Sequence, residues 1–87
     1  MITIDRAKKI AENHISDAFY ISSISEGNLY WYFGLKNAEG FIVPGVSPLA
    51  IDKKTGHLAG MPSVPYYIHK REPLPIELDY ESSTTVM

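Results

Sequence analysis

The chain has 87 residues and a formal net charge of −2, and 45% of its residues are hydrophobic and 11% aromatic. This length fits one small domain, and the composition excludes intrinsic disorder, which requires low hydrophobicity and high net charge. The nearly balanced charge excludes a general attraction to nucleic acid or anionic membranes, and the absence of cysteine excludes disulfides and thiolate metal sites.

The sequence contains no apolar run of about 20 residues, the length that a membrane-spanning helix needs. Its start, MITIDRAKK, lacks the apolar segment of a signal peptide. We therefore expect a cytoplasmic protein that does not insert into membranes.

The first eighteen residues are predicted to form an amphipathic helix. Thr3 is expected to cap its start, and Asp5 places a negative charge near the positive end of the helix dipole. The apolar residues recur at helical spacing and form one stripe, which comprises Ile4, Ala7, Ile10, Ala11, Ile15 and Ala18.

From residue 19 the hydrophobic period changes to two, which predicts strands at residues 19–24 and 28–36 with a turn between them. The second strand directs one set of side chains to the core, namely Leu29, Trp31, Phe33 and Leu35. Tyr30 and Tyr32 lie on its opposite face. A single helix covers only one face of a sheet, so we expect this tyrosine face to be open unless the C-terminal segment folds over it.

A turn at residues 37–40 leads into a predicted strand at 41–43, and a hairpin follows at residues 48–59. In that hairpin the Asp52 carboxylate is expected to cap the turn, and Gly56 supplies a positive φ angle.

The C-terminal third is less regular. Residues 66–69 fit either a short strand or one helical turn. Residues 76–81 alternate apolar with acidic side chains, which is the pattern of an edge strand. Residues 82–87 are expected to form a flexible tail. The predicted fold is α+β: one N-terminal helix packed on a four- to five-stranded antiparallel sheet, in a single domain of residues 1–81.

No catalytic constellation is apparent in the sequence. His14, His57 and His69 have no metal-ligand spacing, and the six glycines form no phosphate-binding loop. We therefore expect no enzyme activity, no cofactor and no metal site. Tyrosines on a sheet face can stack on nucleic-acid bases, but the strand that carries them adds only Lys36, so nucleic-acid binding is not predicted.

Charge is unevenly distributed, because residues 72–87 contain four acidic and no basic side chains. Such a strip either is a solvated edge or docks a basic partner. Tyrosine is enriched at binding hot spots. The candidate partner-binding residues are Tyr66, Tyr67, Glu72, Glu77, Asp79 and Glu81, followed by Tyr30 and Tyr32.

Residues 45–56, GVSPLAIDKKTG, combine a glycine, a nearby proline, an apolar strand that ends in Ile-Asp, and a charged turn that ends in Thr-Gly. Together with the N-terminal helix and the aromatic strand LYWYF at residues 29–33, this order resembles the YrhB-like immunity-protein domain (the Immunity protein 35 family) over about residues 1–60. The resemblance implies a small bacterial protein that binds and neutralises a toxin and has no catalytic motif. The loop before Gly45 is short for the family, and the part after Pro62 has no counterpart in it.

The leading hypothesis is an immunity protein that occludes the surface of a cognate protein toxin encoded by a neighbouring gene. The alternative is a chaperone-like or PepSY-like module that binds peptides along an open sheet edge. A homodimer joined through the tyrosine face is compatible with either hypothesis.

Overall fold

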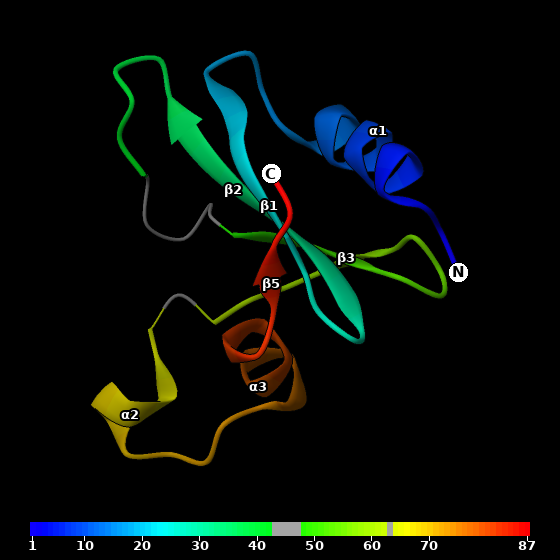
Figure 1. The fold of residues 1–87 in the computed structure, drawn as a ribbon. Helices are drawn as coiled ribbons and strands as arrows, with labels where there is room; N and C mark the ends of the chain where they lie inside the picture. The colour runs from blue at the N-terminus through cyan, green and yellow to red at the C-terminus, as the bar shows by residue number, and fades with distance from the viewer. Residues whose placement is uncertain (43–47, 63) are drawn as a thin grey trace.

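In the computed structural model, which describes residues 1–42, 48–62 and 64–87, helices pack on both faces of one antiparallel sheet (Figure 1). The strand order across the sheet is β4-β3-β2-β1-β5. The strands are β1 (Phe19–Glu26), β2 (Tyr30–Asn37), β3 (Leu49–Asp52), β4 (Leu58–Ala59) and β5 (Thr84–Thr85). The helices are α1 (Ile4–His14), α2 (Tyr66–His69) and α3 (Pro75–Glu81). The predicted α+β fold is confirmed, with two further short helices.

Helix α1 begins as the sequence predicts. The Thr3 hydroxyl accepts a hydrogen bond from the Arg6 amide at 3.3 Å, and Asp5 lies in the first turn. The helix ends at His14 rather than at residue 18, because the backbone of Ile15 is already extended. Its apolar stripe packs on the sheet, where Ala7 and Ala11 are fully buried.

The core between α1 and the sheet is built mainly by β2. Trp31, Phe33 and Leu35 point to this face and pack with Ile24 of β1 and Ile51 of β3. This confirms the predicted core face except at Leu29, which precedes the strand and is about half exposed.

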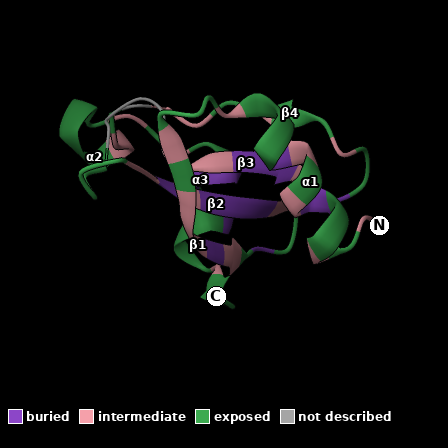
Figure 2. Cartoon of the chain, turned by 90° about the horizontal axis from the view of Figure 1, so that it is seen from above, coloured by how far each residue is buried: buried purple, intermediate pink, exposed green. Residues whose placement is uncertain are grey.

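The second face of the sheet is covered, because α3 packs on it. Tyr32, Ala50 and Ile76 form a second buried cluster there, so an open tyrosine face is excluded. A homodimer through that face would have to displace α3. Figure 2 shows that the buried residues are concentrated in β2 and β3, whereas α2 lies exposed at one end of the molecule.

The edge strand predicted at residues 76–81 is wrong, since these residues belong to α3. Pro75 occupies the first helical turn, where its missing N–H costs nothing. Ile76 and Asp79 are buried, and the ring of Tyr80 contacts that of Tyr32 with centroids 4.9 Å apart. The three residues that face the sheet therefore follow the helical spacing i, i+3, i+4.

The flexible tail predicted at residues 82–87 is also wrong, because β5 pairs antiparallel with the end of β1. The Val86 amide donates to the Ile24 carbonyl at 2.8 Å, and the Ile24 amide donates to the Met87 carbonyl at 3.2 Å. The C-terminus thus extends the sheet beyond β1.

The hairpin turn after β3 is confirmed. The Asp52 carboxylate accepts hydrogen bonds from the amides of Lys54 (2.7 Å) and Thr55 (3.1 Å), and Gly56 has φ of +75°. Those two amides hold the pKa of Asp52 below its ordinary value. By contrast, residues 41 and 42 form no strand, and residues 43–47, which include part of the motif behind the family resemblance, lie outside the described residues.

Candidate functional site

An open cavity of about 360 Å³ lies between α2, α3 and the segments that precede β3 and follow β4, and we call it the α2–α3 groove. Part of its lining is apolar and comes from Pro48, Met61, Pro62 and Pro65. The rest comes from the two helices: Tyr66, Tyr67, Glu77, Tyr80 and Glu81. Its size is at the lower end of the range for ligand pockets, about 300–1,000 Å³.

The segment that carries α2 is a tight turn held by backbone hydrogen bonds and by the Arg71 side chain. Pro65 precedes the single helical turn, and Lys70 ends it in the left-handed conformation with φ of 53°. Arg71 then points back toward the start of the turn: its amide donates to the Tyr66 carbonyl at 3.2 Å, and its guanidinium donates to the Val64 carbonyl at 3.2 Å. The turn is therefore ordered by Arg71 as well as by proline.

The same guanidinium joins this turn to α3 through Glu77. Its two nitrogens donate to the two Glu77 carboxylate oxygens at 2.7 and 2.9 Å, and the Leu74 amide donates to that carboxylate at 2.9 Å. Arg71 and, to a lesser degree, the Leu74 amide hold the pKa of Glu77 below its ordinary value. Glu77 is buried, so it stabilises one wall of the groove and does not form an exposed acidic strip.

A second link between the two helices involves Tyr66 and Glu81. The carboxylate of Glu81 lies near the Tyr66 hydroxyl and raises the pKa of Tyr66. The ring of Tyr67 packs against that of Tyr66 in a T-shaped arrangement, with centroids 5.7 Å apart. Tyr67 itself is 67% exposed.

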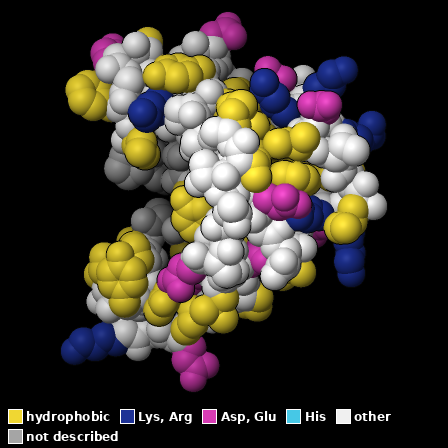
Figure 3. All heavy atoms as spheres, viewed as in Figure 1, with side chains coloured by type: hydrophobic (Ala, Val, Ile, Leu, Met, Phe, Trp, Pro, Cys, Tyr) yellow, Lys and Arg dark blue, Asp and Glu magenta, His cyan; other side chains and the backbone are white. Residues whose placement is uncertain are grey.

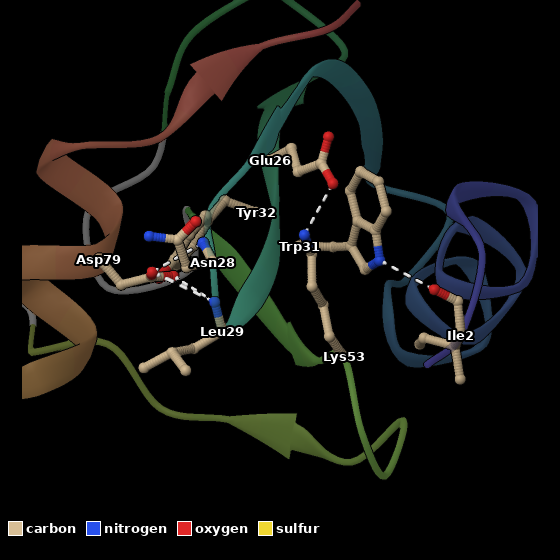
Figure 4. A network of polar contacts seen from close by, with 8 residues as sticks. All are labelled: Ile2, Glu26, Asn28, Leu29, Trp31, Tyr32, Lys53 and Asp79. Atoms are coloured by element: carbon tan, nitrogen blue, oxygen red, sulfur yellow. Dashed lines mark hydrogen bonds and ion pairs between the residues drawn. The ribbon is translucent and has the colours of Figure 1, made fainter.

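Asp79 has a structural position on the other side of α3 (Figure 4). Its carboxylate accepts hydrogen bonds from the amides of Asn28 (2.8 Å) and Leu29 (3.2 Å) and from the hydroxyl of Tyr32 (2.7 Å). It is buried, so it is not part of an exposed acidic strip; it attaches α3 to the turn between β1 and β2.

The two tyrosines of β2 are likewise part of the packing. Tyr32 is buried, which is the main reason that its pKa is raised, and its hydroxyl also lies 3.2 Å from the Ile76 carbonyl. Tyr30 is half-buried beside it, with ring centroids 6.1 Å apart. Neither ring offers an open surface, because the C-terminal segment folds over this face, the exception that the sequence analysis allowed.

Of the eight residues predicted from sequence, the structure brings four to the groove: Tyr66, Tyr67, Glu77 and Glu81. Glu72 is exposed in the connection between α2 and α3 but does not line the groove. Sequence reasoning missed Tyr80, Arg71 and the lining prolines. Pro75 followed by an acidic residue two positions later was the available signal for a helix there.

Large apolar side chains are exposed on α2, on α3 and in the segments next to these helices. We define the α2–α3 apolar surface as the six exposed residues Val64, Tyr67, Ile68, Leu74, Leu78 and Tyr80. Figure 3 shows hydrophobic side chains gathered over α2, at the lower left of the view. Exposed apolar side chains gathered in one region of a surface are typical of sites that contact another molecule.

The end of the sheet away from the α2–α3 groove carries an ion pair next to Trp31 (Figure 4). The Lys53 ammonium lies 2.7 Å from the Glu26 carboxylate and 4.7 Å from the centre of the Trp31 ring. The Trp31 indole donates to the Ile2 carbonyl at 3.4 Å. The Trp31–Ile2 hydrogen bond attaches the N-terminal segment to the sheet, whereas the Lys53 contacts join the turn after β3 to β1 and β2.

Within residues 1–42, 48–62 and 64–87, no group of three or more His, Asp or Glu side chains could hold a metal ion. In the same part of the chain, none of the helices has both the length and the apolar character required to cross a membrane. Comparison of the chain with protein-family models, with curated proteins and with solved structures found no match.

Proposed function

We propose that this chain is a bacterial immunity protein that binds a cognate protein toxin in the cytoplasm and neutralises it by occluding the toxin's surface. The observation that carries the proposal is the α2–α3 apolar surface, on which Tyr67 is 67% and Ile68 is 60% exposed. Exposure of large apolar side chains to water is unfavourable in free energy. Such side chains contribute most to binding when a partner covers them.

The contact surface is also preorganised. The bidentate Arg71–Glu77 pair fixes α2 relative to α3 before any partner arrives. A surface that is already ordered loses little conformational entropy on binding, which favours tight association. Tight, specific inhibition is what an immunity protein requires.

The test is coexpression with the candidate toxin encoded by a neighbouring gene. We expect the chain to restore growth and to form a complex that survives size-exclusion chromatography. The double variant Tyr67→Ala/Ile68→Ala should lose protection and should keep its melting temperature, because both side chains are exposed. Tyr20→Ala is the matched control, since Tyr20 is an exposed tyrosine of β1 that does not line the groove.

Full protection by the double variant would place the contact elsewhere and contradict the proposed surface. Failure of the unaltered chain to protect against any neighbouring toxin would contradict the function itself.

A chaperone-like or PepSY-like peptide-binding role is the second candidate. The observation that favours it is that the sheet ends in two short strands, β4 and β5, which are outermost in the described part of the chain. An extended peptide can add to such an edge through backbone hydrogen bonds. This role predicts many weakly bound clients, whereas the immunity role predicts one stoichiometric partner.

A further inference from the structure

The two glutamates that line the α2–α3 groove differ in how their charges are compensated. Glu77 is buried and paired with both guanidinium nitrogens of Arg71. Glu81 is exposed and lines the groove together with Tyr66, whose hydroxyl is neutral. In the part of the chain that the structure describes, no Lys, Arg or His makes an ion pair with Glu81. The groove therefore carries a negative charge that the chain itself does not balance.

Aromatic side chains line the groove together with this charge. Tyr66, Tyr67 and Tyr80 line the same groove as Glu81. The face of an aromatic ring carries negative electrostatic potential, and cations within about 6 Å of a ring centre are attracted to it. Three tyrosines beside an uncompensated carboxylate thus favour a cationic ligand over a neutral or anionic one.

The remaining lining restricts which cation fits. Pro48, Met61, Pro62 and Pro65 present apolar surface, against which a methylene stem can pack. A guanidinium is planar, is weakly hydrated, stacks on aromatic faces and donates two parallel hydrogen bonds to a carboxylate. An ammonium is more strongly hydrated and has no flat face to stack.

We propose that the α2–α3 groove binds an arginine side chain of the partner protein, with its guanidinium on the tyrosine rings and paired with Glu81. The inference rests on the proposed function, because it names the chemistry of the toxin surface that the chain would occlude. Replacement of that arginine in the toxin should then weaken the complex.

The binding test uses a peptide and needs no toxin. The protein, labelled with carbon-13 in its tyrosine rings, is titrated with acetyl-Ala-Arg-Ala-amide, and the ring resonances are followed by NMR. The same peptide with citrulline in place of arginine keeps the shape and removes the charge. We expect the arginine peptide to shift the resonances of Tyr66, Tyr67 and Tyr80, and the citrulline peptide to bind about two- to fivefold more weakly, the loss expected for one exposed ion pair. The lysine peptide should fall between the two.

Two variants test whether Glu81 supplies the negative charge that binds the arginine peptide. Glu81→Gln should weaken binding of the arginine peptide to the level of the citrulline peptide, whereas Glu12→Gln, which removes an exposed carboxylate of α1, should have no effect. Tyr66→Phe keeps the ring and removes only the hydroxyl near Glu81, so it should leave arginine binding equal or tighter. This variant also serves as the test if Glu81→Gln unfolds the protein.

Equal binding of the arginine and citrulline peptides would overturn the inference, as would unchanged affinity in Glu81→Gln, loss of binding in Tyr66→Phe, or shifts confined to Tyr20 and Tyr30. The outcome is separable from that of the proposed function. If the chain protects growth but does not bind the arginine peptide, the inference is overturned and the proposed function stands. If the chain binds the arginine peptide but protects against no toxin, the proposed function is overturned and the inference about the groove stands.

Discussion

The buried carboxylate of Asp79 is expected to be a main determinant of how firmly α3 is held on the sheet. It accepts hydrogen bonds from two backbone amides of the β1–β2 turn and from the hydroxyl of Tyr32, which lies about fifty residues away in sequence (Figure 4). Asp79→Ala removes the acceptor for all three donors at once. Because Tyr32 and Asp79 are both buried, part of this loss cannot be recovered from water.

The magnitude follows from the three contacts. A hydrogen bond to a charged group contributes about 1.5–3 kcal/mol, but contacts that share one acceptor are not additive. Water can also reach the amides of the turn. We therefore expect Asp79→Ala to lower the free energy of unfolding by about 3–4 kcal/mol, a large part of the roughly 5–15 kcal/mol available to a small domain.

Asp79→Asn provides an internal comparison. The amide oxygen can still accept from the amides of Asn28 and Leu29, and the Tyr32 hydroxyl can turn to the Ile76 carbonyl, which lies 3.2 Å away. The expected loss is about 1–2 kcal/mol, since all the donors keep an acceptor but that acceptor is now neutral.

The assay is urea denaturation followed by the fluorescence of Trp31, which is the single tryptophan and is buried in the core. Glu12→Ala on the exposed side of α1 is the control and should change the free energy of unfolding by less than about 0.5 kcal/mol. A loss below about 1 kcal/mol for Asp79→Ala, or equal losses for the alanine and asparagine variants, would refute the structural role assigned to this carboxylate.

Three further predictions address neighbouring features. Gly27→Ala should lower stability by about 1–3 kcal/mol in the same assay, because the added Cβ would overlap the Asp79 carboxylate; an unchanged urea midpoint would contradict this. The ion pair lowers the pKa of Glu77 below its ordinary 4.5, so its contribution to stability is present above that pH and is lost as the pH falls through the lowered value. Acid denaturation should therefore be less steep below about pH 4.5 in Glu77→Gln, and parallel curves would count against the pair. Truncation of residues 84–87 should increase hydrogen exchange at the Ile24 amide, which donates to the last residue of the chain, and unchanged protection would exclude β5 as a stable strand.

The candidate site could be predicted only in part. Tyr66, Tyr67 and Glu81 were selected from composition and charge, and they do line the groove. Asp79 was selected by the same reasoning, yet it is buried because its partners lie in a turn distant in sequence. A carboxylate in an acidic segment has the same appearance in sequence whether it faces water or satisfies buried amides. The pairing of Arg71 with Glu77 could not be predicted from the sequence either, since it depends on how the turn of α2 folds back toward α3.

Local signals determined the N-terminal half of the fold. The Thr3 cap and the apolar stripe define α1, the alternation around Trp31 defines β2, and Asp52 with Gly56 defines the hairpin, because each depends on neighbours within a few residues. Residues 76–81 were different: in so short a segment, apolar positions at 76, 78 and 80 fit a strand, and positions 76, 79 and 80 fit a helix.

Only the tertiary structure decided between these possibilities. The helix places the Asp79 carboxylate on the β1–β2 turn and Tyr80 against Tyr32, and it leaves β1 free to pair with the C-terminal β5. Those contacts join residues far apart in the chain, so no local pattern records them. The groove between α2 and α3 exists for the same reason, and with it the surface on which the proposed function depends.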